Sequence, residues 1–163
     1  MIRVGLGFDA HPFNERRPFI LGGIEILGSP GLSGHSDADV LSHAVADGLL
    51  GAANLGDLGA LFPNDERWHG ASSLLILSET AEAVATAGWS IVNVDATVVA
   101  EVPRLNPYRD RMTGNVADAL RIEHENVSIK ATTTDHLGFV GRGEGIAAIA
   151  VVLLERTRVG EAG

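Results

Sequence analysis

The chain of 163 residues contains no cysteine, and this absence excludes disulfide bonds, a thiolate nucleophile and zinc sites built from cysteine. Any metal ion must therefore be bound by histidine and carboxylate side chains. Aromatic residues are also scarce, at 5% of the chain, although 45% of the residues are hydrophobic. We expect a core made mostly of valine, isoleucine, leucine and alanine.

Positive charge is in short supply as well. The chain has 12 Lys and Arg residues but 21 Asp and Glu residues, which gives a formal net charge of −9. An acidic protein offers no counter-charge to nucleic acid or to an anionic membrane surface, so we expect neither as a partner. An anionic ligand would need metal ions and a few local donors to neutralise its charge.

Long apolar runs are missing too. No run is long enough to span a bilayer, and the opening residues 1–8 are too short and too rich in glycine for a signal peptide. We therefore expect a cytoplasmic protein. The length predicts a single domain over residues 1–157, with a frayed tail at 158–163.

Strand-like and helix-like segments alternate along the chain. Their order predicts a mixed α/β or α+β fold, in which a mainly mixed β-sheet packs on helices. The segment 146–154 has hardly any polar residue, which predicts a strand covered on both faces, by helices or by another subunit, and favours a homo-oligomer. The expected strands are 2–8, 89–101, 127–133 and 145–154, with a hairpin over 18–27 that turns at Gly22-Gly23; the expected helices are 37–54, 71–87 and one from after Pro107 to about Arg121.

The first of these helices carries its own start signal. Ser36 is a suitable N-cap, and Asp39 follows three residues later, as in a capping box. An apolar face is supplied by Leu41, Val45, Leu49 and Ala52. The polar residues 55–70 that follow predict a long loop, and loops of this length are usually functional or mobile.

Two histidines and an aspartate form the first candidate site. Asp9 and His11 are two apart on an extended stretch, so both side chains point to the same side, and His43 can approach from the first helix. Such a set can hold a catalytic zinc ion with its fourth position open. Asp39, Asp47 or a backbone carbonyl could orient the His43 ring. The alternative is that Asp9 merely ends a strand and His43 is an ordinary helix histidine.

The segment from Lys130 to Gly145 forms the second candidate site. It gathers three threonine hydroxyls, a carboxylate, an arginine and backbone amides freed by glycine, which together suit phosphate oxygens. Asp135 could hold magnesium against the same phosphates. The alternative is an ordinary threonine-rich strand end and a tight turn. Elsewhere, His35 at the expected helix start suits an anion, and Asp57 with Gly59 suits the hydroxyls of a polyol.

Together these motifs resemble the 2-C-methyl-D-erythritol 2,4-cyclodiphosphate synthases of the non-mevalonate isoprenoid pathway. The resemblance implies a homotrimer with each active site between neighbouring subunits. The implied enzyme is a phosphorus–oxygen lyase that converts 4-diphosphocytidyl-2-C-methyl-D-erythritol 2-phosphate to the 2,4-cyclodiphosphate and releases CMP. The matching stretches recur in order over nearly the whole chain: Gly7–His11, His35–Val40, His43, Gly56–Gly59, Ala100–Leu105, Ala131–Asp135 and Gly141–Gly145.

The resemblance also implies roles for single residues. The implied metal ligands are Asp9, His11 and His43 for a zinc-type cation and Asp135 for magnesium or manganese. Transition-state stabilisation would fall to His35 and Thr133. The residues implied to contact the substrate are Asp9, His11, His35, Ser36, Asp57, Leu58, Gly59, Asp65, Ala100, Pro103, Arg104, Leu105, Thr132, Thr133, Thr134, Asp135, Phe139 and Arg142.

The implied chemistry agrees with the composition. Phosphoryl transfer needs positioning and charge neutralisation more than it needs a covalent nucleophile from the protein. The substrate brings its own nucleophile, so good alignment can supply several kcal/mol of the barrier. Two divalent cations also explain how an acidic protein would bind a polyphosphorylated nucleotide.

Several positions depart from the usual family pattern. Asp135 stands where many members have glutamate, and Arg104 replaces lysine, which keeps the charge but changes its shape. The loop after Phe62 is one residue shorter than the common acidic version. Leu6 and Val140 replace a common histidine and a common threonine near the trimer axis.

Two other functions remain open from the sequence. A zinc-dependent phosphoesterase would use metal-bound hydroxide on a phosphate and would give a linear product. A trimeric binding module for anionic isoprenoid metabolites would tolerate loss of His43, whereas the enzyme should not.

Overall fold

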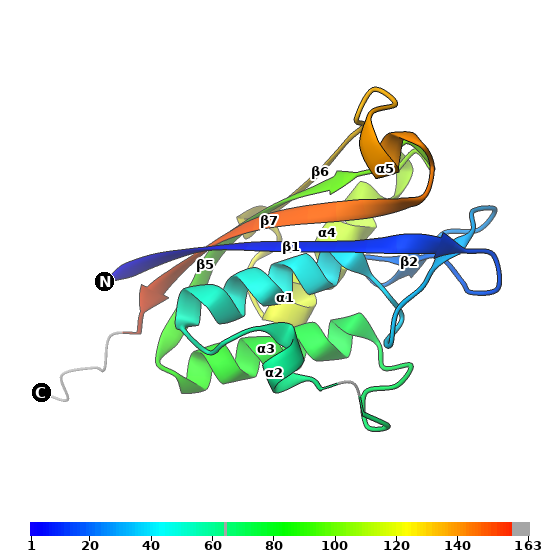
Figure 1. The fold of residues 1–163 in the computed structure, drawn as a ribbon. Helices are drawn as coiled ribbons and strands as arrows, with labels where there is room; N and C mark the ends of the chain where they lie inside the picture. Colours follow the sequence, from blue (N-terminus) through cyan, green and yellow to red (C-terminus); the bar gives the residue numbers. More distant parts are fainter. Residues whose placement is uncertain (64, 158–163) are drawn as a thin grey trace, which may run out of the picture.

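The structure, a computed structural model, describes residues 1–63 and 65–157. Its largest element is a five-stranded sheet in the order β4-β1-β7-β5-β6, and helices cover one face of it (Figure 1). The tail predicted at 158–163 lies outside the described residues. No described helix is long and apolar enough to cross a membrane. The strands are β1 Ile2–Asn14, β4 Gly31–Leu32, β5 Trp89–Val99, β6 Val127–Thr132 and β7 Gly145–Arg156.

The sheet is mixed, as predicted. β1 pairs antiparallel with β7, and β7 pairs antiparallel with β5, whereas β5 and β6 run parallel. Parallel neighbours need a crossover connection, and α4 (Arg109–Leu120) provides it here. The short 3₁₀ helices η1 (Asn106–Tyr108) and η2 (His124–Asn126) lie at its two ends.

Two smaller elements lie beside the sheet. The hairpin of β2 (Ile20–Leu21) and β3 (Ile24–Glu25) turns at Gly22-Gly23, as predicted. Both glycines have positive φ angles, 54° and 68°, which a tight hairpin turn requires. The second element is the one-turn helix α5 (Gly138–Gly141), which lies between β6 and β7 and was not predicted.

Helix α1 (Val40–Ala53) lies between the sheet and α3 (Ser73–Thr86), so that most of its residues are buried (Figure 1). The predicted apolar face is confirmed, because Leu41, Val45 and Leu49 are fully buried. The end of α3 also agrees with the prediction, since Gly88 follows it with a φ of 81°.

Glycines in β1 let α1 approach the strand backbone. A Cβ atom at Gly7 would lie 1.9 Å from the carbonyl oxygen of Ala44, and one at Gly5 would lie 2.0 Å from that of Gly48. Only residues without a side chain fit between strand and helix at these two points. The close approach brings the start of α1 next to the side chains that follow Gly7 on the strand.

The start of α1 differs from the prediction. Asp39, rather than Ser36, is the N-cap, and its carboxylate accepts hydrogen bonds from two backbone N–H groups of the first turn. Ala38 has a φ of 61°, so the chain is not helical before Asp39. The prediction that His35 lies at a helix N-terminus is therefore wrong.

Three further boundaries differ. β1 continues to Asn14, so Asp9 lies inside the strand instead of closing it. The predicted loop 55–70 contains the short helix α2 (Leu58–Leu61). β7 continues to Arg156 because its last residues pair with both neighbours, β1 and β5.

The sheet face opposite the helices is apolar and exposed in the single chain. Leu6 on β1 is 67% exposed, and Val151, its registered partner on β7, is 41% exposed. The chain's own helices thus cover only one face of β7. The strand was predicted to be covered on both faces, by helices or by another subunit. The described part of the chain leaves its other face uncovered.

Candidate active site and metal centre

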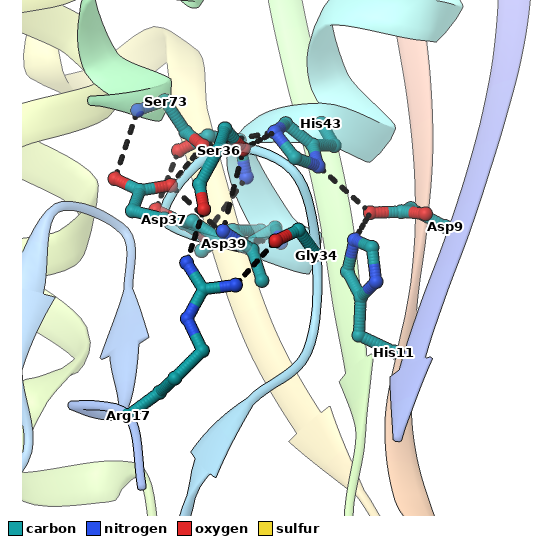
Figure 2. Close-up of polar contacts among 12 residues, drawn as sticks. Asp9, His11, Arg17, Gly34, Ser36, Asp37, Asp39, His43 and Ser73 are labelled. Atoms are coloured by element: carbon teal, nitrogen blue, oxygen red, sulfur yellow. Dashed lines mark hydrogen bonds and ion pairs between the residues drawn. The ribbon is translucent and has the colours of Figure 1, made fainter. Parts of the chain in front are cut away.

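Asp9 and His11 point to the helix side of β1, because they alternate in step with Gly7 along the strand. His43 reaches them from the first turn of α1 (Figure 2). Asp9 Oδ2 lies 3.0 Å from His43 Nδ1 and 3.0 Å from His11 Nε2. The three donor atoms all lie within 4.8 Å of one another. The structure thus gathers the residues of the predicted zinc site.

One nitrogen of this group needs a further partner. His11 Nε2 is buried and has no partner in hydrogen-bonding geometry among the described residues. Burying a polar atom without a partner costs free energy, and a cation bound to all three donors would remove that cost. Two imidazole nitrogens and one carboxylate oxygen suit a zinc ion with its fourth position open. The residues present therefore fit a zinc-type cation.

The three side chains also alter each other's pKa values. Burial would raise the pKa of Asp9, but the contacts with His11 and His43 outweigh it and hold this pKa well below its usual range. Burial would lower the pKa of His43, but the Asp9 carboxylate outweighs it and raises this pKa. Asp9 is therefore ionised and ready to act as a metal ligand.

Two serine hydroxyls contact the other ring nitrogen of His43. Ser36 Oγ lies 3.0 Å and Ser73 Oγ lies 2.9 Å from His43 Nε2 (Figure 2). The Ser73 hydroxyl donates to the Asp37 carboxylate, which also accepts the Ser73 backbone N–H at 2.8 Å. Asp37 was predicted to lie in the first turn of α1, but its carboxylate instead accepts hydrogen bonds from the first turn of α3.

Asp39 has a different task from the one predicted. Besides capping α1, its fully buried carboxylate accepts the Gly23 backbone N–H at 2.9 Å and the Ser42 hydroxyl at 2.8 Å. Burial raises the pKa of Asp39, and the nearby negative charge of Asp37 adds to this. Among the described residues no hydrogen bond joins Asp39 or Asp47 to the His43 ring, so the predicted orienting role is wrong for both.

Arg17 holds the loop that precedes α1. Its guanidinium donates to the carbonyl oxygens of Gly34 and Ser36, which flank His35 (Figure 2). His35 Nε2 lies 2.8 Å from the carbonyl oxygen of Asp65, on the loop after α2. No local sequence signal pointed to Arg17, because its partners lie 17 and 19 residues further along the chain.

A cavity of about 160 Å³ lies beside the candidate metal site. The Asp57 carboxylate caps the helix α2 at its edge and accepts the Ala60 N–H at 2.8 Å. Several residues predicted to contact the substrate therefore surround one space next to His43. The lining residues are His35, Ser36, His43, Leu58, Gly59, Phe62, Trp68 and Ile76.

The predicted substrate contacts from Ala100 to Leu105 belong to a second group of residues. The Ala100 N–H donates to the Thr132 carbonyl oxygen at 2.9 Å, which joins this loop to the end of β6. Leu105 is buried and lines a small cavity, while Pro103 is half-buried and Arg104 exposed. No role was predicted for Glu101, whose carboxylate accepts hydrogen bonds from Thr134 and His136 in the segment after β6.

The predicted phosphate segment is open to solvent. Thr132, Thr133 and Asp135 are exposed, and the Thr133 hydroxyl lies 3.4 Å from the Asp135 carboxylate. Asp135 also has a positive φ of 52°. An exposed carboxylate with weak protein contacts is a suitable ligand for magnesium that arrives with a diphosphate.

Further along the chain, Phe139 on α5 is 40% exposed. The guanidinium of Arg142 pairs with Glu144, with 2.6 Å between Nε and Oε1. Both predicted substrate contacts therefore lie at the surface of the single chain.

The two groups of predicted site residues stay apart within one chain. Asp9 lies on β1 and Thr132 on β6, with β7 and β5 between them. Three strand spacings of about 4.8 Å separate the two strands by about 14 Å. The cavity at His43 and the cavity at Leu105 have no lining residue in common.

Comparison with known proteins gives consistent matches over almost the entire chain. The model of the YgbB family matches residues 2–155. The 2-C-methyl-D-erythritol 2,4-cyclodiphosphate synthase of Syntrophomonas wolfei is 54% identical over 156 residues, which cover 95% of this chain and 99% of that protein. The synthase of Moorella thermoacetica is 54% identical over 154 residues, 94% of each chain.

Solved structures share the fold. The bifunctional IspDF of Campylobacter jejuni aligns with a TM-score of 0.92 at 40% identity over 96% of this chain. The present chain spans 42% of that longer protein. IspF of Plasmodium falciparum in complex with CDP aligns with a TM-score of 0.84 at 31% identity, and the alignment covers 96% of this chain and 97% of that one.

Proposed function

The chain belongs to the YgbB family and converts 4-diphosphocytidyl-2-C-methyl-D-erythritol 2-phosphate to 2-C-methyl-D-erythritol 2,4-cyclodiphosphate with release of CMP; we propose that it does so at a zinc site formed by Asp9, His11 and His43. The observation that carries this proposal is that Asp9, His11 and His43 bring three donor atoms within 4.8 Å of one another, while His11 Nε2, 3.0 Å from Asp9 Oδ2, has no partner in hydrogen-bonding geometry among the described residues. A bound cation is the simplest group that satisfies all three.

The reaction is an intramolecular, metal-dependent phosphoryl transfer. An oxygen of the 2-phosphate attacks the β-phosphorus, the bond from this phosphorus to the α–β bridging oxygen breaks, and CMP leaves with that oxygen. No water is consumed, so we assign the enzyme to the phosphorus–oxygen lyases. Because nucleophile and electrophile are tethered, the protein mainly has to align them and balance their charge.

A zinc ion held by these three residues would position and polarise the β-phosphate. The protein prepares the site in two ways. The pKa of Asp9 lies well below its usual range, so its carboxylate supplies a negative charge, and the rigid strand and helix fix the three donors. The side chains of His35 and Ser36 flank the adjoining cavity and would contact the substrate phosphates.

The same cavity would take the methylerythritol part of the substrate. Leu58 and Gly59 line it, and Asp57 lies at its edge. Asp65, whose carbonyl oxygen contacts His35, would complete this side of the site. His35 would stabilise the transition state from here.

The other end of the substrate would bind the second group of residues. Ala100, Pro103, Arg104 and Leu105 would form the cytosine pocket. Thr132, Thr133 and Thr134 would contact the diphosphate, with Thr133 also stabilising the transition state. Asp135 would hold magnesium or manganese with the same diphosphate. Phe139 and Arg142 would lie near the ligand and the subunit interface.

We propose a homotrimer with each site between two subunits. Two observations support it: the two groups of site residues are about 14 Å apart in one chain, and an apolar sheet face is exposed. One subunit would supply the metal side of a site and its neighbour the nucleotide side. The cytoplasmic location expected from the sequence stays a prediction.

Turnover in ¹⁸O-labelled water tests the reaction class. We expect a cyclic diphosphate and CMP that carry no label, as found by ³¹P NMR and mass spectrometry. A linear phosphate product that carries ¹⁸O would instead identify a metal-dependent hydrolase. Absence of turnover with zinc and magnesium present would favour a binding protein.

A further inference from the structure

Ser73 is a fully buried residue in the first turn of α3, and its side chain lies between two other groups. On one side its hydroxyl donates to the Asp37 carboxylate. On the other side its oxygen lies 2.9 Å from Nε2 of His43 (Figure 2). Three side chains from separate parts of the sequence thus form a chain of hydrogen bonds that ends on a predicted metal ligand.

The direction of these hydrogen bonds follows from the chemistry of the groups. A serine hydroxyl has one proton, and Ser73 gives it to a carboxylate, which accepts but cannot donate when ionised. Ser73 can therefore offer only a lone pair to His43. The ring must then carry its proton on Nε2, which leaves the lone pair of Nδ1 for another partner.

Nδ1 is the nitrogen that faces the candidate metal site, 3.0 Å from Asp9 Oδ2. Two lone pairs that face each other at this distance repel, unless a proton or a cation lies between them. Without a metal ion this place can hold a second ring proton that Nδ1 donates to Asp9, and a cation that displaces this proton binds Nδ1 while Nε2 keeps its own. A hydrogen bond on the far nitrogen is the usual way in which proteins fix the tautomer of a metal-bound histidine.

We propose that Ser73, held by Asp37, is a positioning residue that sets the tautomer and ring orientation of His43 for metal binding. This inference rests on the proposed function, because it assumes the metal site at Asp9, His11 and His43. Ser73 itself is buried behind His43 and touches neither the metal position nor the adjoining cavity.

Ser36 and Asp37 also have other tasks, which makes Ser73 the informative position. Ser36 contacts the same nitrogen at 3.0 Å, but it also lines the cavity and would contact substrate. Asp37 accepts the Ser73 backbone N–H and so replaces the missing side-chain cap of α3. The change Ser73→Ala keeps that backbone bond and removes only the hydroxyl.

The test measures zinc affinity by competition with a chelator in the parent, Ser73→Ala and Ser42→Ala proteins. Ser42 is the matched control, because its buried hydroxyl also donates to an aspartate, Asp39, and has no contact with His43 Nε2. We expect Ser73→Ala to weaken zinc binding by about 10- to 100-fold, as is typical for outer partners of metal ligands. Ser42→Ala should change it by less than about twofold.

Proton NMR of the zinc-loaded parent adds a readout that needs no variant, because a buried Nε2–H bonded to Ser73 should give a downfield His43 signal that exchanges slowly with water. Where Ser73→Ala folds, this signal should shift in the variant. Equal zinc affinities with an unmoved signal would overturn the proposal while leaving the metal site intact. If the parent binds no zinc, the metal site itself fails, and the proposal fails with it.

Discussion

The Glu101 carboxylate accepts two hydrogen bonds from Thr134, one from its backbone N–H and one from its hydroxyl, and both distances are 3.0 Å. The same oxygen accepts the His136 backbone N–H at 3.2 Å. Glu101 belongs to the proposed cytosine loop, and Thr134 belongs to the proposed diphosphate segment. The Glu101 side chain thus holds the two parts of the proposed nucleotide site in a fixed position relative to each other.

Removing this carboxylate should impair catalysis without unfolding the chain. Glu101→Ala removes all three contacts, and we expect kcat/KM to fall by roughly 10- to 100-fold, because small misplacements of positioning groups have effects of this size. Glu101→Gln keeps the accepting oxygen and is the matched control, with a loss below about threefold. Steady-state kinetics measures kcat/KM of the two variants. Equal losses in both would contradict the account, because Glu101→Gln keeps the oxygen that accepts these hydrogen bonds.

The same carboxylate should make stability depend on acid pH. The hydrogen bonds from Thr134, above all from its backbone N–H, hold the pKa of Glu101 below its ordinary value of 4.5. The unfolded state therefore binds the proton more tightly, so this contribution is present above about pH 4.5 and is lost as the pH falls through the lower native pKa. Thermal unfolding of the parent and Glu101→Gln should show a difference that shrinks on acidification. A constant difference would contradict this.

The contact between β1 and α1 should not tolerate a side chain. In Gly7→Ala the new Cβ would overlap the Ala44 carbonyl oxygen, so we expect a loss of about 1–3 kcal/mol in the free energy of unfolding. The shift of α1 should also weaken zinc binding through His43. Gly51→Ala is the control: this α1 position has open space around it, and the change should stabilise by up to about 1 kcal/mol. Urea unfolding measures both, and an unaffected Gly7→Ala protein would refute the close approach.

The exposed sheet face should mediate assembly. Leu6→Glu places a charge in the apolar face formed with Val151, and we expect the trimer to dissociate. Leu27→Glu is the control, because Leu27 is 81% exposed and lies outside the five-stranded sheet. Light scattering after size-exclusion chromatography gives the mass of each variant. A parent that is monomeric, or a Leu6→Glu protein that stays trimeric, would contradict the proposed interface.

Sites shared between subunits predict complementation. The variants His43→Ala and Asp135→Ala should each be inactive, because each lacks one side of every site. Mixed trimers would contain sites with an intact side from each variant, so refolding them together at equal amounts should restore about a quarter of the parent activity. No recovery from mixtures shown to contain mixed trimers would place the whole site in one subunit.

Local patterns predicted most of the elements and the grouping of Asp9, His11 and His43. Asp9 and His11 lie two apart on an extended strand, as predicted, and the predicted apolar residues of α1 are buried, although α1 is buried on nearly all sides. The mixed sheet followed from the alternation of strands and helices. The predicted start of α1 was wrong because serine and aspartate are both good N-caps. Asp39 also accepts a hydrogen bond from Gly23, a contact that no local sequence pattern contains.

Partners distant in sequence could not be predicted. Ser73 lies 30 residues from His43 and 36 residues from Asp37, and Glu101 lies 33 residues from Thr134. Each pair meets only because helices and strands pack in one specific way. The side chains that we predict to bind a ligand lie in recognisable motifs, whereas those that hold them in place do not.

The most direct test of the metal centre follows turnover by ³¹P NMR in protein stripped of metal, with magnesium present throughout. We predict no CMP and no cyclic diphosphate until zinc is returned, full recovery at about one zinc per subunit, and no recovery in His11→Ala. Stripped protein, or His11→Ala protein, that forms the cyclic product at the parent rate would show that Asp9, His11 and His43 do not hold a catalytic metal.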